Sequence, residues 1–451
     1  MISRDIEKGV NRMKRIICIV LLCMLLLACQ PTPGEEAVKN RTDGALEQAI
    51  VATAAPSYVY EAPSRWEETF MARSREVRVS ADIEVPTAER FPVTTIKQHT
   101  LTTSDVVSFL QGVCAGDWVI RENEYSREEL TEDLKHAAKG SYMGIDETTG
   151  EQIWQPNEEE MKRIQSLIEQ APLEDRFEPL TAENLSFPIK TIPIKDSAGT
   201  TWYLFAKNST ANNRVTLRRH RDGVIQTENV VQQGEATPGE PPHALEHIVI
   251  AKEDAIRTGN ALIEALGLND FKVAEAQKAR EMQSYTYAVY GEGWWLTYVN
   301  TLDGTVPCFY GDYGNPDYLS FTQVEATYAP PWRQECVQIF VTEEGIRFIG
   351  WVYPKETVMT ASENVQLLPF SDIQKSVKKL LEYGTGGFEG SPILINRMVL
   401  TTSIAQIPNQ GDEAFYVPTW VIFLTTEEEA GLFFDADVLL INAVDGTLIG
   451  R

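Results

Sequence analysis

Ser371-Asp-Ile-Gln-Lys-Ser-Val-Lys-Lys-Leu-Leu-Glu-Tyr-Gly384 is the stretch that decides the fold, because it predicts an amphipathic helix in front of a run of strands. Ser371 and Gln374 have the spacing of a capping box, and Gly384 is the residue type that ends helices. Apolar side chains recur at three-to-four spacing and form one stripe, made of Ile373, Val377, Leu380 and Leu381. Lysines occupy the opposite side, so we expect the apolar stripe to cover a sheet.

Three apolar segments follow this helix, at residues 397–407, 417–424 and 438–444. They are rich in β-branched and aromatic residues, and Asp445-Gly446 forms a turn signal after the last one. A helix followed by antiparallel strands predicts an α+β fold, in which the helices pack on one face of each sheet.

The same order of elements occurs upstream. Residues 252–266 predict a helix, 285–290 and 294–300 predict strands around the turn Gly291-Glu292-Gly293, and 334–341 with 346–353 predict a hairpin. We therefore expect a C-terminal α+β domain at 245–451. The pattern leaves open whether it is one unit or two helix-plus-sheet units, at 245–360 and 361–451.

The first half follows the same plan with more helix. Alternating residues predict a strand at 75–85, and an apolar face at three-to-four spacing predicts a helix at 102–112. Ser126 and Asn157, each before an apolar stripe, predict the starts of two more helices. Two further strands are predicted, at 201–206 and 214–219. Glycine and proline without apolar periodicity mark residues 232–242 as a linker. We therefore expect an N-terminal α+β domain at 64–235.

The 451 residues carry a formal net charge of −25, from 40 basic and 65 acidic side chains. An acidic surface of this kind argues against nucleic acid as a partner. The one basic cluster, Arg218-Arg219-His220-Arg221, is either a solvated strand end or a patch for a carboxylate or phosphate. The sequence leaves the oligomeric state open.

The N-terminus has the layout of a secretory signal, with Lys14 and Arg15 before an apolar run over residues 16–27. Met1 or Met13 is the start. Leu26-Leu27-Ala28-Cys29 resembles the lipobox of bacterial lipoproteins. The resemblance implies that the signal peptide 1–28 is removed and that Cys29 carries the lipid that anchors the chain outside the cytoplasm. An ordinary signal peptide with a chance cysteine is the alternative, and residues 29–63 are expected to be the lipidated cysteine and a flexible tether.

The C-terminal half carries a second resemblance. The run Ala251-Lys-Glu-Asp-Ala-Ile-Arg257 looks like the opening of a PepSY-type unit. Trp420-Val-Ile-Phe-Leu424, followed by Val438-Leu-Leu-Ile-Asn-Ala-Val-Asp-Gly-Thr-Leu-Ile449, resembles the closing hairpin of such a unit, from which Asn442, Asp445 and Gly446 depart. The whole chain is similar to an uncharacterised (domain-of-unknown-function) family of clostridial lipoproteins, and its C-terminal half, roughly residues 245–451, is similar to units of the Yyc-type accessory proteins. The latter regulate an essential sensor kinase from outside the cell, and the resemblance supplies no catalytic residue.

The residues themselves show no catalytic constellation. The sequence has no Gly-x-Ser-x-Gly elbow, Walker A loop or dinucleotide fingerprint. His243 and His247 are four apart, but prolines precede them and β-branched residues follow, so a helical metal site is not expected there. A Cys308–Cys336 bridge is conceivable without being demanded by the spacing, and we expect these thiols and that of Cys114 to be buried. We predict no catalytic, cofactor or metal site.

The aromatic strands offer a different kind of surface. Trp294 and Trp295 are adjacent, so in a strand they point to opposite faces. An exposed platform for a sugar or peptide would consist of Trp294, Trp295, Tyr298, Trp351 and Tyr353. The alternative is that both faces of the sheet are covered.

Two functions remain in consideration. The first is a lipid-anchored, non-enzymatic extracytoplasmic protein that binds or regulates another cell-envelope protein. The second is a lipoprotein that captures a glycan or peptide on the aromatic strands.

Overall fold

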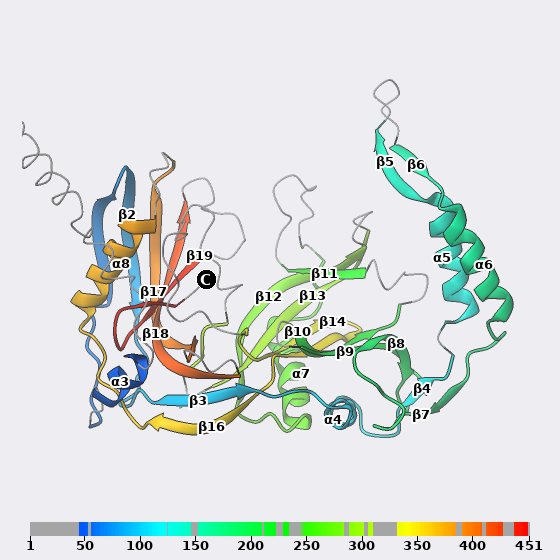
Figure 1. Ribbon diagram of the computed structural model, residues 1–451, viewed down its shortest axis with the longest axis horizontal. Helices are drawn as coiled ribbons and strands as arrows, with labels where there is room; N and C mark the ends of the chain where they lie inside the picture. Colours follow the sequence, from blue (N-terminus) through cyan, green and yellow to red (C-terminus); the bar gives the residue numbers. More distant parts are fainter. Residues whose placement is uncertain are drawn as a thin grey trace, which may run out of the picture.

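A computed structural model of the chain describes residues 45–52, 56–123, 125–145, 152–209, 212–221, 229–233, 245, 247–283, 288–301, 305–309, 332–384, 390–407, 412–426 and 437–449. Figure 1 shows two large sheets side by side, with a helical arm projecting from the end of the second. The mixed helix and strand content and the mostly antiparallel pairing confirm the coarse α+β prediction. The predicted signal peptide and Cys29 lie outside the described residues.

Sheet 1 has eight strands, in the order β1-β2-β17-β18-β19-β20, and β3 connects β18 to β16. The strands are β1 (Arg65–Ala72), β2 (Arg75–Glu84), β3 (Val93–Gln98), β16 (Lys355–Ser362), β17 (Ile393–Gln406), β18 (Glu413–Thr426), β19 (Asp437–Asn442) and β20 (Leu448–Ile449). Their pairing is antiparallel except between β2 and β17, which are parallel. Sheet 1 therefore joins strands from the two ends of the chain.

Helix α8 (Phe370–Gly384) covers sheet 1 with the predicted stripe. Ile373, Val377, Leu380 and Leu381 are all fully buried. The ring of Phe370 packs against Trp420 of β18 and Trp66 of β1, with ring centroids 5.2 Å and 6.3 Å apart. Full burial of one such apolar side chain is worth about 1.5–3 kcal/mol, so this stripe fixes α8 on the sheet. The helix begins at Phe370, one residue before the predicted cap.

Sheet 2 has ten strands, in the order β11-β12-β13-β14-β15-β10-β9-β8-β4-β7. They are β4 (Val119–Arg121), β7 (Phe177–Pro179), β8 (Ile189–Lys195), β9 (Thr201–Ser209), β10 (Asn212–Arg219), β11 (Asn229–Gln233), β12 (Phe271–Gln283), β13 (Val289–Asn300), β14 (Cys336–Thr342) and β15 (Gly345–Val352). Helices α4 (Thr103–Val113) and α7 (Lys252–Ala265) cover one face, and their apolar residues share one core with the strands.

Glycine allows α7 to approach sheet 2 closely. A Cβ at Gly259 would lie 2.4 Å from the Tyr298 hydroxyl and 2.9 Å from Leu296 Cδ1. The helix backbone therefore packs directly against β13, and Tyr298 Oη donates to the Ile256 carbonyl at 3.2 Å. This contact holds Tyr298 inside the core.

At two junctions between described strands the chain crosses from one sheet to the other, and this contradicts the predicted domain division. β3 lies in sheet 1 and leads into α4 on sheet 2, while β15 lies in sheet 2 and leads into β16 of sheet 1. The two crossing points lie together, because the His99 amide donates to the Pro354 carbonyl at 2.9 Å. Neither 64–235 nor 245–451 is therefore a separate unit, since each half supplies strands to both sheets.

Three further expectations need correction. The tether was expected to remain flexible to residue 63, but α3 (Ala45–Ala52) buries Ile50, and Tyr60 Oη donates to the Leu368 carbonyl at 2.8 Å. The expected turn at residues 291–293 lies inside β13 and pairs with β12, a strand that the sequence analysis missed. The linker expected at 232–242 begins inside β11, and residues 234–244 lie outside the described residues.

Candidate interaction surface

The five aromatic residues predicted as a platform do not form one. Trp294 and Trp295 do point to opposite faces, as expected, because Trp294 packs against the core under α4 and α7 and Trp295 against the other face. Trp295 stacks on Phe348, with ring centroids 5.2 Å apart. The Trp294 indole nitrogen donates to the Ile250 carbonyl at 3.0 Å. Each ring is thus held by the fold on its own side of sheet 2.

The other three aromatic residues also serve packing. Tyr298 is fully buried, and this burial raises the pKa of its hydroxyl group. Trp351 stacks on Phe109 of α4 with centroids 6.4 Å apart, and Tyr353 is half-buried at the crossing point with φ 51°. The alternative expectation, in which the surrounding structure covers the rings, is therefore the correct one.

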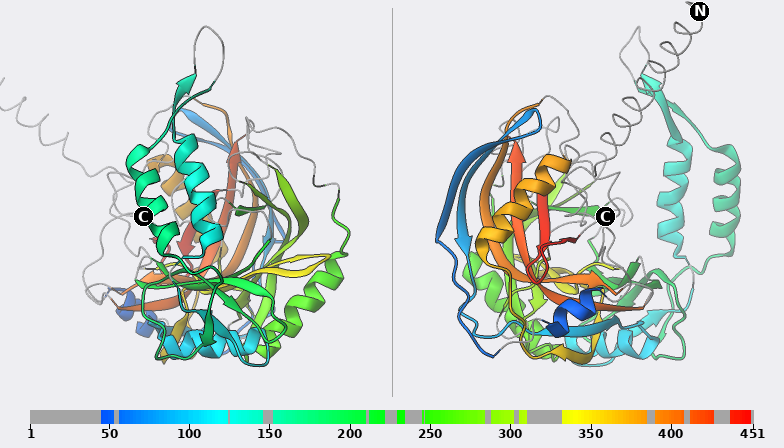
Figure 2. Two further views of the ribbon diagram at one scale, coloured as in Figure 1. Left: turned by 90° about the vertical axis from the view of Figure 1, so that its right-hand side faces the viewer. Right: turned by 60° about the vertical axis from the view of Figure 1, so that its left-hand side comes forward.

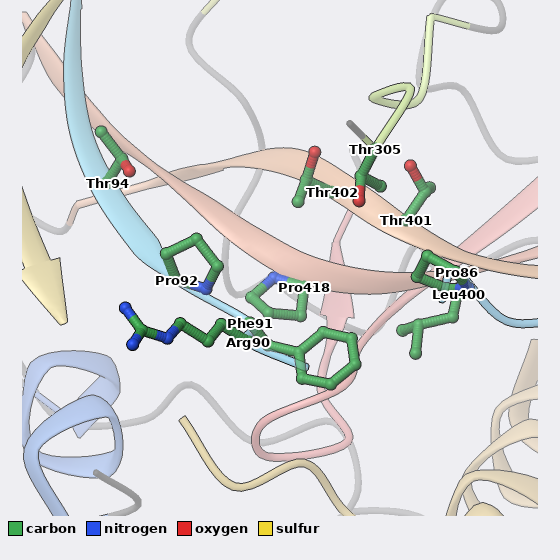
Figure 3. Close-up of a pocket in the computed structure, with 10 residues that line it drawn as sticks. All are labelled: Pro86, Arg90, Phe91, Pro92, Thr94, Thr305, Leu400, Thr401, Thr402 and Pro418. Atoms are coloured by element: carbon green, nitrogen blue, oxygen red, sulfur yellow. The ribbon is translucent and has the colours of Figure 1, made fainter. Parts of the chain in front are cut away.

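Figure 3 shows a small cavity in sheet 1, beside Phe91 and Pro418. Its volume is about 20 Å³. One water molecule needs roughly 10–15 Å³ of such space for its centre, so the cavity has room for water but not for a sugar ring or a peptide. The hydroxyl group of Thr402, one of its lining residues, is buried and has no hydrogen-bond partner among the described residues.

The structure describes the three cysteines and one of the two histidines that the sequence analysis considered for thiol and metal chemistry. Cys308 and Cys336 are buried and form no disulfide, so the conceivable bridge between them is not present. Cys114, which we expected to be buried, is only partly buried at the end of α4. Within the described residues, no group of three or more His, Cys, Asp or Glu side chains is arranged to hold a metal ion. His247 is exposed, and His243 lies outside the described residues. No helix among the described segments has both the length and the apolar character to cross a bilayer.

Arg221, the last residue of the basic run after β10, belongs to an ion-pair network with Glu281, Glu344 and Arg347. Arg221 Nη2 lies 3.4 Å from Glu281 Oε2 and 3.2 Å from Glu344 Oε2. Arg347 Nε, from β15, lies 3.2 Å from the same Glu281 Oε2 atom. Burial lowers the pKa of Arg218 in this cluster. All four residues of the run are half-buried and Arg221 is ion-paired, so the run is not a fully solvated strand end.

A second polar cluster lies where the chain crosses between the sheets. Lys355 Nζ is 3.9 Å from Glu335 Oε2, and only 4% and 5% of their side chains are exposed. Trp351 Nε1 donates to the other Glu335 oxygen at 2.9 Å. Lys355 also donates to Tyr416 Oη, which donates to Gln334 Oε1 at 2.7 Å.

Burial shifts both charged groups of this pair towards their neutral forms. Desolvation lowers the pKa of Lys355 to about 8, and it raises the pKa of Glu335 against the opposing attraction of Lys355. The pair connects the residue before β14 to the first residue of β16, where the chain crosses between the sheets.

His99 joins elements of the two sheets beside this cluster. Its Nδ1 lies 2.6 Å from Glu356 Oε1 on β16, and its Nε2 lies 3.1 Å from Asp105 Oδ2 on α4. Burial lowers the pKa of His99, but the two carboxylates outweigh burial and leave the pKa raised. The protonated imidazole therefore strengthens the connection between the sheets.

The arm is the feature that the sequence analysis missed. It is inserted between β4 and β7 and consists of α5 (Arg127–Lys139), β5 (Ser141–Ile145), β6 (Gln152–Gln155) and α6 (Glu158–Gln170). Figures 1 and 2 show that its two helices stand out from sheet 2 and that the β5–β6 ribbon forms the far end. We call this ribbon the tip.

Capping and a small separate core hold the arm together. The predicted capping box of Ser126 and Glu129 is present, and Asn157 caps α6. Leu130, Ala137 and Ile164 are buried between the helices, in a cluster separate from the core of sheet 2. Two helices alone bury little, so Leu134, Leu167 and Ile168 remain only half-buried.

The tip exposes large apolar side chains. Met143 is 60% exposed, Ile153 47% and Trp154 36%. Lys139 Nζ lies 4.1 Å from the centre of the Trp154 ring. The ribbon is the two-stranded sheet β5–β6, which is separate from both large sheets. Exposed apolar groups collected at the end of a projection are typical of an interaction surface.

No protein-family model matches the chain, and no curated protein is significantly similar to it. A crystal structure of an uncharacterized protein from Eubacterium rectale is similar over 90% of this chain and 99% of the other, with 12% sequence identity and a TM-score of 0.42. A likeness this distant carries no argument about function.

Proposed function

We propose that this chain is a lipid-anchored, non-enzymatic protein on the extracytoplasmic side of the cell membrane, where it binds or regulates another cell-envelope protein. The anchor is the lipid on Cys29, as the lipobox-like sequence implies. The helix-plus-strand groups of α7 with β12 and β13, and of α8 with β17–β19, support the finer proposal of PepSY-like units.

The observation that carries the proposal is the arm. It contributes nothing to the cores of the two sheets, and it exposes apolar side chains at its end. Exposing such groups to water is unfavourable unless a partner covers them, and a groove or ribbon of this kind is where partners bind. The aromatic residues that would support glycan binding are built into the fold, so we do not extend that alternative.

The connection of the arm to sheet 2 permits a clean deletion. β4 and β7 pair side by side, with Arg121 opposite Phe177, and the Glu122 amide donates to the Arg176 carbonyl at 2.9 Å. Replacing residues 123–175 with Asn-Gly would close the two strands with a two-residue hairpin turn. The body should stay folded, because the arm has its own core.

The test is a crosslinking capture from the native membranes of the source cells, read by mass spectrometry, with the full chain and the armless variant. We expect one dominant envelope protein with the full chain and its loss with the armless variant. Equal capture by both variants would remove the arm from the proposal, and no specific partner would contradict the function itself. Labelled palmitate should enter the wild-type chain and not Cys29→Ser, and incorporation into Cys29→Ser would refute the anchor.

A further inference from the structure

We propose that one buried arginine of sheet 2 fixes the direction of the arm, and that breaking its ion pairs releases the arm to pivot as one body. The arginine is Arg121, the last residue of β4, and its partners are Glu129 and Asp175. We call these three residues the latch. This inference deepens the proposed function, because it concerns how the arm that we assign to partner binding is presented, but it is tested without the partner.

The arm and sheet 2 have separate apolar cores. Leu130, Ala137 and Ile164 pack between α5 and α6, whereas Trp118 and Ile120, at the base of the arm, belong to the core of sheet 2. Two bodies that share no large apolar interface are expected to move relative to each other unless another contact holds them. The direction of the arm therefore depends on the polar contacts at its base.

One guanidinium group holds both chain connections of the arm. Arg121 Nη1 lies 2.8 Å from Glu129 Oε2, in the first turn of α5, and 3.5 Å from Asp175 Oδ2, in the segment that returns from α6. Arg121 Nε donates to the Asn123 carbonyl at 3.0 Å. A single side chain of β4 thus binds the outgoing and the returning connection to the same edge of sheet 2.

The burial of the latch is unequal, and this makes it strict. Only 4% of the Arg121 side chain is exposed, against 32% for Glu129 and 29% for Asp175. A guanidinium group stays charged in proteins, so a movement of the arm that withdrew the carboxylates would separate a desolvated cation from its partners. The direction of the arm seen in the structure is the one that keeps this cation paired.

Further hydrogen bonds transmit the latch to both helices. Glu129 Oε2 also accepts from the Ser126 amide at 3.0 Å, as part of the capping box that begins α5. Arg127 Nη2, at the start of α5, donates at 3.0 Å to the carbonyl of Ala171, which caps the end of α6. Because the two helices are joined at their base and packed on each other, they respond to the latch together.

The experiment measures the distance between a spin label at position 165 on α6 and another at position 261 on α7, in the purified full-length protein. Gln165 and Ala261 are exposed, and labels on unnatural amino acids leave Cys114 unmodified. We expect a single narrow distance distribution for the wild type. Arg121→Met and Glu129→Gln should each at least double its width, because each removes one charge of the latch. Glutamine also completes a capping box, so Glu129→Gln leaves the start of α5 in place.

Arg163→Gln is the matched control, because it breaks the ion pair of Arg163 with Glu160 on the surface of α6, away from the latch. Its distribution should be as narrow as that of the wild type, and equal broadening by this variant would overturn the latch. A broad distribution in the wild type, or an unchanged width in Glu129→Gln, would also overturn it, and Glu129→Gln decides the question if Arg121→Met does not fold. A failed capture of an envelope partner would remove the proposed function without changing these widths, so the two failures are distinguishable.

Discussion

Replacing Lys355 tests how much the stability of the protein depends on the buried ion pair of Lys355 and Glu335. Lys355→Met leaves the Glu335 carboxylate in the interior without its cation. At the 3.9 Å separation of Nζ and Oε2, the lost attraction is about 4 kcal/mol with an effective dielectric constant of about 20. Breaking a buried ion pair typically costs roughly 3–5 kcal/mol, so both arguments predict a large loss of stability at neutral pH.

The second variant separates the charge from the shape. Lys355→Met/Glu335→Gln removes both charges and keeps an acceptor for Trp351 Nε1, which now bonds to Glu335 at 2.9 Å. Because desolvation opposes both charged forms, we expect the double variant to recover most of the loss, leaving a coupling energy of at least about 2 kcal/mol. The single variant Glu335→Gln serves as the control that completes the cycle.

The sign of the pH effect is a further check on this pair. In Lys355→Met the pKa of Glu335 stays raised by burial and no longer has the opposing lysine. The folded variant therefore holds a proton that the unfolded chain releases, and its stability falls as the pH rises through the folded pKa. The loss relative to wild type should thus shrink in acid.

The assay is equilibrium unfolding in urea, followed by tryptophan fluorescence at several pH values. A loss below about 1 kcal/mol for Lys355→Met at pH 7.5 would refute the reasoning, as would a double variant no more stable than the single one.

Three further predictions concern other parts of the fold. Gly259→Ala should destabilise the protein by about 1–3 kcal/mol, because its Cβ would meet the Tyr298 hydroxyl at 2.4 Å. Adding Tyr298→Phe should restore part of the lost stability, measured by thermal unfolding. No recovery of stability would show that the strain lies elsewhere. His99 contributes stability that is fully present below its ordinary pKa near 6.5 and is lost as the pH rises through its raised pKa in the folded protein. His99→Gln should therefore make the melting temperature less dependent on pH between pH 6 and 8. An unchanged slope of melting temperature against pH would contradict this. Of Cys114, Cys308 and Cys336, only Cys114 should react with a thiol reagent in the native state, because the other two are buried and burial raises the pKa of Cys336 to about 12; fast labelling of Cys308 or Cys336, mapped by peptide mass, would show an opening of the core.

Local signals in the sequence located the helices well. Ser126 and Asn157 cap α5 and α6 as predicted, and the stripes of α4, α7 and α8 are their buried faces. These predictions succeed because a cap and a stripe depend on residues within a few turns of one another. The hairpin of β14 and β15 was found for the same reason.

Long-range pairing could not be predicted in this way. β2 pairs in parallel with β17, and no local pattern connects Val77 to Ile393. β12 was missed because its solvent-facing residues, such as Lys272 and Lys278, hide the strand pattern. The domain boundary was wrong for the same reason, since chain order does not determine which sheet a strand joins.

The arm could have been anticipated only in part. Its helices were predicted, but their apolar stripes look like those of any core helix. What distinguishes the arm is that β4 and β7 meet at its base, and these strands have three residues each. The aromatic platform could not be judged from the sequence, because a tryptophan in a predicted strand does not show which other element will cover it.

Sheet 1 combines strands that are far apart in the sequence, and this affects the order in which it can form during synthesis. β2 ends at Glu84, and its second neighbour in the sheet, β17, is complete only at Gln406, which is 322 residues later. At a synthesis rate of roughly 5–20 residues per second, the hairpin of β1 and β2 waits about 16–64 s for the strand that pairs with Val77 and Val79. Until β17 is made, β2 keeps an unpaired edge, and an unpaired strand edge is a place where another chain can pair and aggregate.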